Sequence, residues 1–285
     1  MPFIGLTDLG RVGVDLFFVL SGFIILHSTY ERGRSCLDFA IARWRRIYLP
    51  YLPVGLVMAF LIFVWTPHQH LNLRGWLASI TLLPVGEPAL NVAWTLQHEV
   101  VFYGFVALAL LTGWWRAGLL VWIVAIVAFL LSGRTAPVGV QPIDGEFLMG
   151  VAAWAAWKSG NHRTMLVTST ALCLLAAGLA LAGPVLAIER SALIAAAAVC
   201  AAVLPWLVRA DQQQLIRTPR FLGFLGDASY SIYLIHALPL LVLVDLLAGW
   251  SWWVIFPVIA GAGLAAGIGY HLLVERPLLR WKVSR

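Results

Sequence analysis

VGVDLFFVLSGFIILH, residues 12–27, is apolar enough to cross a membrane, yet it contains an acidic residue. Asp15 lies near its start, and Ser21 and Gly22 lie in its middle. A carboxylate at membrane depth costs about 2.5–3.5 kcal/mol on insertion scales, so a helix that only spans would not keep one. Asp15, Val19 and Gly22 share one face of a helix. This face is predicted to point Asp15 into a bundle and to let another backbone approach Gly22.

The composition of the whole chain indicates a membrane protein. Of its 285 residues, 61% are hydrophobic and only 11% are charged, whereas about 25% are charged in a typical soluble domain. The predicted fold class is all-α, a polytopic transmembrane helix bundle. Because no long polar linker interrupts it, a single domain over residues 1–285 is expected. The net charge of +6 is interpreted as membrane topology, and no nucleic-acid partner is predicted.

The hydrophobic segments predict how often the chain crosses the bilayer. A hydrocarbon core needs roughly 20 apolar residues per helix, which gives about nine spans. They are residues 12–29, 47–66, 94–111, 117–132, 145–157, 165–182, 191–209, 229–248 and 253–274. The Ala-rich segment 171–203 is predicted to form two packed helices, broken at Gly183 and Pro184. The loop 67–93 is expected to lie along the external surface or to fold back over the bundle.

The basic residues predict the orientation of these spans. With the N-terminus outside, 15 of the 19 Lys and Arg residues fall on the cytoplasmic side, as the positive-inside rule requires. The four outside are Arg11, Arg74, Arg134 and Arg190. The C-terminus is then cytoplasmic. One more helix before Met1 would give a ten-span design with both ends inside.

A second polar group lies in AWTLQHEVVFYGFVAL, residues 93–108. Thr95, Glu99 and Tyr103 recur every four residues and share a helix face. A membrane Glu with these neighbours can orient or deprotonate a hydroxyl; alternatively, it only fixes helix packing. His98 lies on another face of this helix. It either takes part in catalysis or only caps or snorkels at the membrane interface.

A basic block occupies DFAIARWRRIYLP, residues 38–50. Arg43, Arg45 and Arg46 are predicted at the inner membrane surface, with Arg43 and Arg46 on one face. Guanidinium groups bind phosphate through paired hydrogen bonds, so the block is either a clamp on an anionic ligand or a positive-inside anchor.

The segment FLGDASYSIYLIHALPL, residues 224–240, carries a polar stripe. Asp227 is expected to be a helix N-cap. Ser229, Tyr233 and His236 would lie on one face, where they line a cavity or form a hydrogen-bond ladder between helices.

Two smaller motifs complete the set. In Glu275-Arg276-Pro277, the proline is expected to stop the last helix and the ion pair to lie at the interface. His68 and His70 have the spacing of metal ligands but no carboxylate partner nearby, so no metal site is predicted.

Five blocks together resemble the membrane-bound acyltransferase family often called type 3, which O-acylates sugars and surface polysaccharides. They are GVDLFFVLSGF at 13–23, RWRRIYLP at 43–50, WTLQHEVVFY at 94–103, LGDASYSIYLIH at 225–236 and ERP at 275–277. The resemblance implies an inner-membrane enzyme that takes an acyl group, usually acetyl, from cytoplasmic acyl-CoA and passes it to a glycan hydroxyl at the outer face. The third block resembles the exopolysaccharide-modifying branch. Expected partners are the bilayer, acyl-CoA, the glycan acceptor and polysaccharide-biosynthesis proteins.

The resemblance also implies residue roles. Asp15 and Glu99 match acidic positions of the family core, Arg43 and Arg46 match the basic pair expected at the CoA phosphates, and Ser21 and Gly22 match the pair that shapes the first packing contact.

One element of the family pattern is absent from the sequence. Family members begin with a helix bearing a catalytic His, but only 12 residues precede Gly13 here, and none is His. We therefore expect a late start or a truncated, inactive copy, unless His98 or His236 substitutes.

Two other functions remain open from the sequence. A transporter or flippase for a lipid-linked glycan would also keep polar residues near the midplane, but it predicts paired Gly- or Pro-broken helices in two halves, which the sequence lacks. The third hypothesis is an inert fragment or a scaffold.

Overall fold

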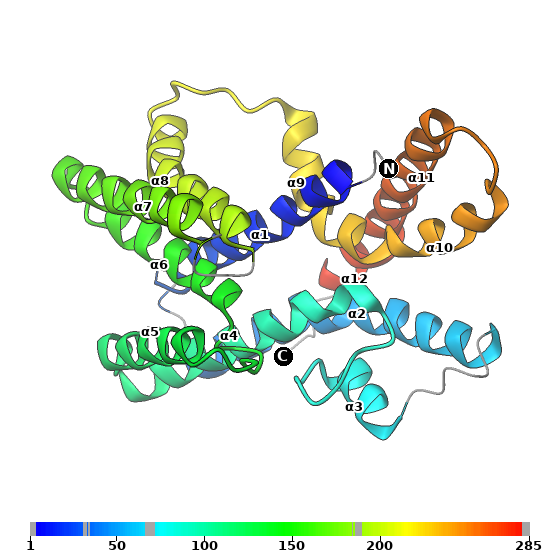
Figure 1. Cartoon of the computed structure of the whole chain (residues 1–285), viewed down its shortest axis with the longest axis horizontal. Helices are drawn as coiled ribbons and strands as arrows, with labels where there is room; N and C mark the ends of the chain where they lie inside the picture. The colour runs from blue at the N-terminus through cyan, green and yellow to red at the C-terminus, as the bar shows by residue number, and fades with distance from the viewer. Residues whose placement is uncertain are drawn as a thin grey trace. The chain divides into compact units, whose positions relative to one another are not determined.

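The computed structural model describes residues 4–30, 33, 35–65, 72–183, 185 and 190–280. Every regular element among them is helical, as Figure 1 shows, so the prediction of an all-α fold is confirmed. The elements are α1 Ile4–Tyr30, α2 Cys36–Trp65, α3 Leu73–Thr81, η1 Asn91–Ala93, α4 Trp94–Thr112, α5 Trp115–Ser132, η2 Pro142–Asp144, α6 Gly145–Lys158, α7 His162–Ala182, α8 Ser191–Gln212, α9 Arg220–Ile235, α10 Ala237–Leu246, α11 Trp252–Tyr270, η3 His271–Glu275 and α12 Arg276–Arg280.

Many of these helices are long and apolar enough to cross a membrane. In the described part of the chain seven qualify, or eight if α9 and α10, bent by 41°, form one span. Helix α6, predicted as a span over 145–157, has 14 residues and is shorter than the roughly 20 that a crossing normally needs. The chain is therefore a multi-pass membrane protein.

The helices gather into two compact units, and each is described by itself. Unit 1 contains Met1–Phe39 and His98–Arg217, and unit 2 contains Ala40–Gln97 and Thr218–Arg285. Helices α2 and α4 each contribute residues to both.

Unit 1 is built on a close crossing of α1 and α6. A Cβ added to Gly22 would lie 2.2 Å from the carbonyl oxygen of Phe147, and one added to Gly150 would lie 2.0 Å from that of Val19. Each glycine thus admits the backbone of the other helix, as small residues do in membrane helix pairs. The prediction that Gly22 lets a backbone approach is confirmed.

Ring contacts show that α1 and α6 run in the same direction. The rings of Phe18 and Phe147 lie 4.6 Å apart, and those of His27 and Trp157, two to three turns further along both helices, lie 5.0 Å apart. This direction agrees with the predicted topology, in which both helices are odd-numbered spans.

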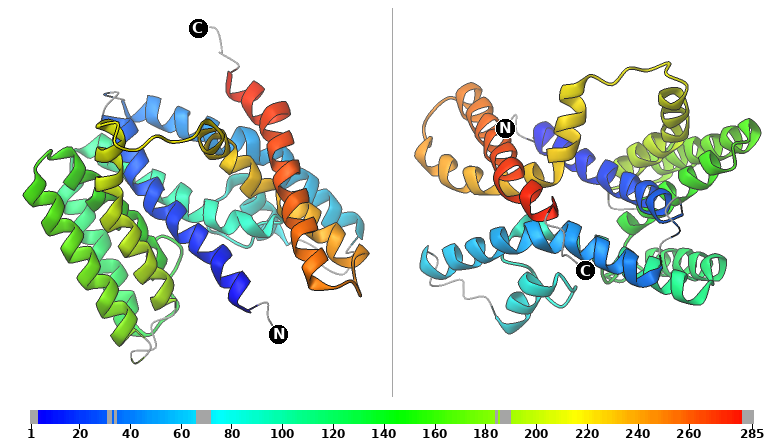
Figure 2. Two further views of the ribbon diagram at one scale, coloured as in Figure 1. Left: turned by 90° about the horizontal axis from the view of Figure 1, so that it is seen from above. Right: turned by 180° about the vertical axis from the view of Figure 1, so that it is seen from behind.

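Helices α7 and α8 form the Ala-rich pair that the sequence predicts, and they lie side by side in Figures 1 and 2. The Ser169 hydroxyl donates to the carbonyl of Ala202 over 2.6 Å and accepts from the Trp206 indole over 2.8 Å. Gly183 caps α7, while Pro184 lies outside the described residues. Small side chains on α8 allow the approach: Ala195, Ala197, Ala198, Ala201 and Ala202 are all buried.

Unit 2 joins α2 to α3, and α9 and α10 to α11. Tyr51 donates its hydroxyl to the carbonyl of Ser79 over 2.7 Å, which holds α3 against α2. A Cβ on Gly267 would lie 2.4 Å from Cα of Ile232, so α9 and α11 are in backbone contact. Figure 2 shows α11 beside α9 and α10.

Two expected helix ends are wrong. Asp227 is not an N-cap, because α9 begins at Arg220 after Pro219; a proline forces the residue before it out of helical geometry and so sets the boundary there. Pro277 does not stop the last helix, because the chain continues helically to Arg280. A π-helical stretch, His271–Glu275, immediately precedes it and shifts the hydrogen-bond register that the proline would interrupt.

Candidate active site

Glu99 lies in a buried polar cluster of unit 1. Its carboxylate accepts a short hydrogen bond from the Tyr103 hydroxyl on the same helix. The Ser21 hydroxyl of α1 lies 3.4 Å from the same oxygen. All three side chains are buried. The face predicted for Glu99 and Tyr103 is confirmed, and Ser21 joins it from another helix.

His98 is paired with a carboxylate that the sequence does not predict. Its Nδ1 lies 2.7 Å from Oδ1 of Asp144, and both side chains are buried. The second oxygen of Asp144 accepts from the backbone N–H groups of Gly139 and Gln141, over 3.0 and 2.8 Å. With Oδ2 taken up by these two donors, Oδ1 of Asp144 lies where it can accept the Nδ1 proton of His98, and in that tautomer the imidazole lone pair is on Nε2. This His–carboxylate pair has the arrangement of a general base and its orienting group.

Asp15 points inward, as predicted, and is fully buried. Nη2 of Arg190, the residue before α8, lies 2.6 Å from its Oδ1. Glu146, on the first turn of α6, is also fully buried and lies beside Asp15. Unit 1 therefore holds Asp15, Glu146, His98 and Glu99 on helices α1, α4 and α6, with Arg190 entering from α8.

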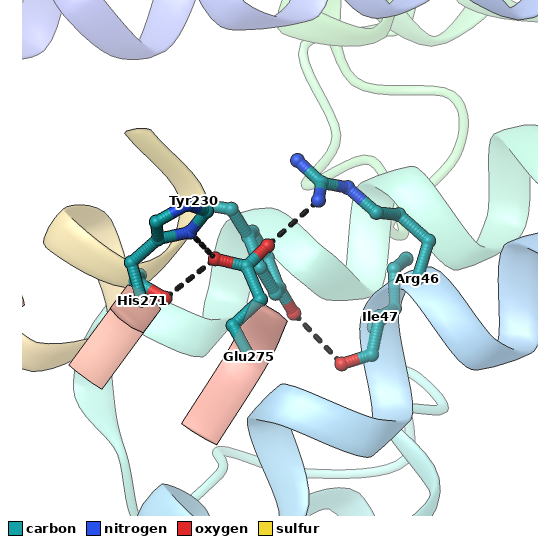
Figure 3. Close-up of polar contacts among 6 residues, drawn as sticks. Arg46, Ile47, Tyr230, His271 and Glu275 are labelled. Carbon is teal, nitrogen blue, oxygen red and sulfur yellow. Dashed lines mark hydrogen bonds and ion pairs between the residues drawn. The ribbon is translucent and has the colours of Figure 1, made fainter. Parts of the chain in front are cut away.

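Arg46 of the basic block lies in unit 2 and is bound to a carboxylate. Its Nη1 lies 2.6 Å from Oε1 of Glu275. The other oxygen of Glu275, Oε2, accepts from the Ser231 hydroxyl over 2.6 Å and lies 2.7 Å from Nδ1 of His271. Figure 3 shows Arg46 and His271 both pointing at this carboxylate. The expected Glu275–Arg276 pair is thus replaced by one with Arg46, 229 residues away.

The other site residues predicted in unit 2 differ in their contacts and in their burial. Thr95 lies 2.7 Å from the Tyr233 hydroxyl, so these two predicted residues are brought together. His236 lies at the break between α9 and α10, where its Nδ1 contacts the carbonyl of Tyr233 over 2.7 Å. Ser229 is exposed, and the buried serine of α9 is Ser231. Arg43 and Arg45 are partly buried on α2, and His68 and His70 lie outside the described residues.

Comparison with known proteins places the chain in a family. Residues 2–272 match the profile of the type-3 acyltransferase domain. The chain belongs to this acyltransferase family. It is 30% identical to exopolysaccharide production protein ExoZ of Rhizobium meliloti, over 95% of this chain and 90% of that protein. Nodulation protein 10 of Rhizobium leguminosarum bv. viciae is 28% identical over 95% and 83%, and acyltransferase MdmB of Streptomyces mycarofaciens is 27% identical over 96% and 82%. No solved structure matches it.

Three residues of this acyltransferase's polar core are not among those predicted from the sequence. Glu146 lies on the first turn of the apolar helix α6, and the rule that singles out Asp15, an acidic residue inside an apolar segment, also applies to it. Asp144 ends η2, directly before α6, and lies outside the predicted apolar segment 145–157. From the sequence, Arg190 is predicted only to be one of the outer basic residues, because no local pattern links it to Asp15.

Proposed function

We propose that this chain transfers an acyl group, most simply acetyl, from cytoplasmic acyl-CoA to a hydroxyl of a cell-surface glycan. Membership of the acyltransferase family and similarity to a protein named for exopolysaccharide production support this choice of reaction and acceptor. The proposal places the enzyme in the bacterial inner membrane with its N-terminus outside and its C-terminus in the cytoplasm, following the distribution of basic residues.

The observation that carries the proposal is the buried His98–Asp144 pair in unit 1. In the proposed reaction, Nε2 of His98 takes the proton of the acceptor hydroxyl, and the resulting alkoxide attacks the thioester carbonyl. The tetrahedral intermediate expels the CoA thiolate, which recovers the proton from the imidazolium. Asp144 stabilises that imidazolium, as the acidic member of a triad does.

Glu99 supports the same reaction from the adjacent position on α4. With Tyr103 and Ser21 bound to it, it can orient the acceptor through a hydrogen bond. The proposed sites for the CoA phosphates are the arginines of the basic block, Arg43, Arg45 and Arg46, because guanidinium groups bind phosphate oxygens well; Arg46 also contacts Glu275.

The experiment measures transfer of label from acetyl-CoA to membrane glycan in vesicles that contain the full chain. His98→Gln is expected to lower the rate by about 10²-fold or more, since general acid–base groups contribute roughly that amount. Glu99→Gln is expected to weaken transfer as well. Glu87→Gln, which removes an exposed carboxylate, is the control. A His98→Gln variant with wild-type transfer would refute the assignment of the base, and a wild-type chain without acyl-CoA dependence would refute the function.

A further inference from the structure

Two carboxyl groups and one guanidinium meet inside unit 1. Asp15 on α1 and Glu146 on α6 both have no exposed surface. Arg190 approaches from the start of α8 and forms an ion pair of 2.6 Å with Oδ1 of Asp15. The close crossing of α1 and α6 fixes the two carboxyl groups next to each other, because the backbones of the two helices are in contact one to two turns further on.

The hydrogen bonds of this cluster are incomplete. In the described part of the chain, no group donates to Oδ2 of Asp15 or to either oxygen of Glu146, although all three oxygens are enclosed. Buried polar atoms without partners are rare and require an explanation. The two carboxyl groups lie within hydrogen-bonding reach of each other, but two ionised carboxylates can only repel.

The surrounding charges do not offset a second ionised carboxylate. The positive charge of Arg11 on α1 attracts the carboxyl group of Asp15, and that of Arg190 attracts both carboxyl groups. Asp144, two residues before Glu146, adds a further negative charge on the same side, and its own oxygens are satisfied by His98 and backbone N–H groups. An ionised Glu146 would therefore be a buried charge with no donor of its own, which is strongly unfavourable.

We propose that Glu146 carries a proton and donates it in a hydrogen bond to Oδ2 of Asp15. One proton then satisfies the orphan oxygen of Asp15 and an oxygen of Glu146, and it leaves a single negative charge opposite Arg190. Glu146 becomes a positioning residue, since it holds the carboxylate of Asp15 against Arg190. Like His98 near the start of α4, Glu146 lies near the start of its own helix, α6, in unit 1. Its effect on acyl transfer rests on the proposed function, whereas its protonation does not.

The direct test is infrared difference spectroscopy on exchange from H2O to D2O, with the full chain in lipid vesicles near neutral pH. The wild type is expected to show the carbonyl band of a protonated, buried carboxyl group. Glu146→Gln should remove this band, and Glu87→Gln, at an exposed position, should retain it. A wild type without the band, or a Glu146→Gln variant that keeps it, would overturn the proposal.

Activity and folding of three variants give a second readout. Glu146→Gln keeps a donor to Asp15, so transfer is expected within about threefold of the wild type, because replacing a hydrogen bond by an equivalent one costs little. Glu146→Leu removes the donor and is expected to lower transfer by about tenfold or more. The double variant Asp15→Asn with Glu146→Gln removes both carboxyl groups that face Arg190 in this cluster. Its loss of folded protein should exceed the sum of the losses in the two single variants.

These readouts separate the two proposals. If the band depends on Glu146 but His98→Gln transfers normally, only the proposed catalytic base fails. If Glu146→Gln is as impaired as Glu146→Leu, Glu146 acts as an ionised group and the present inference is overturned.

Discussion

The crossing of α1 and α6 offers the most direct test of the fold of unit 1. In Gly22→Ala, the new Cβ would lie 2.2 Å from the carbonyl oxygen of Phe147 and 3.0 Å from its carbonyl carbon, whereas an ordinary contact is 3.4–4 Å. The obstacle is backbone in the middle of a helix, which no rotamer change can move aside. The distance from the new Cβ to the Phe147 oxygen must grow by about 1.2 Å to reach ordinary contact at 3.4 Å, so the two helices must separate by about that amount.

The expected loss of stability combines two opposing effects. Overpacking costs about 1–3 kcal/mol, and the better helix propensity of alanine returns up to about 1 kcal/mol. The middle of these two ranges gives a net loss of about 1.5 kcal/mol, which lowers the midpoint of thermal unfolding by about 3–6 °C for a protein of this size. Gly104→Ala is the matched control: this glycine of α4, also in unit 1, has nothing within 4 Å of an added Cβ and should be neutral or slightly stabilising.

Thermal unfolding in detergent, followed by intrinsic fluorescence, provides the measurement, since the chain contains 14 Trp residues. Gly150→Ala, which meets the Val19 carbonyl at 2.0 Å, should be destabilised similarly. The double variant with Gly22→Ala should lose less than the sum, because one separation of the helices accommodates both methyl groups. If Gly22→Ala unfolds at the same temperature as Gly104→Ala, the helices do not cross as described.

Other predictions concern the polar contacts. Asp144→Asn should keep the fold but lower acyl transfer by at least about tenfold, because the imidazolium of His98 loses its carboxylate; the rate per folded protein in vesicles measures this. Glu275→Gln should lower the free energy of unfolding by about 1.5–3 kcal/mol, since a charged acceptor of several hydrogen bonds is lost, and thermal unfolding beside Glu87→Gln would reveal it. Tyr233→Phe removes donation to the Val92 carbonyl at 2.6 Å and should cost about 1 kcal/mol in the same assay.

Relations along one helix were readable from the sequence. Glu99 and Tyr103 are four residues apart, and helix geometry alone puts them in contact. The inward direction of Asp15 follows from the cost of an acidic side chain in lipid. The close approach at Gly22 follows from its place on the same face as Asp15, although the sequence did not show that α6 would be the partner.

The ends of helices were harder to predict from the sequence, because the residues at a helix end decide where it starts and stops more than the hydrophobic pattern does. Asp227 has the side chain of a cap, yet α9 starts seven residues earlier at Arg220, where Pro219 fixes the backbone. The polar stripe predicted on this helix is correct only in part. Tyr233 contacts Thr95, but the buried serine is Ser231 and not Ser229.

The amino-acid sequence by itself determined that the chain is a bundle of membrane helices with acidic side chains turned inward, because hydrophobicity and helix periodicity are local properties. Only the tertiary structure decided which cations and bases those acids meet. Arg190 lies 175 residues from Asp15, and Arg46 lies 229 residues from Glu275. Such partners are chosen by how helices pack, and a basic residue at a helix end looks the same in sequence whether it anchors the membrane or neutralises a buried carboxylate.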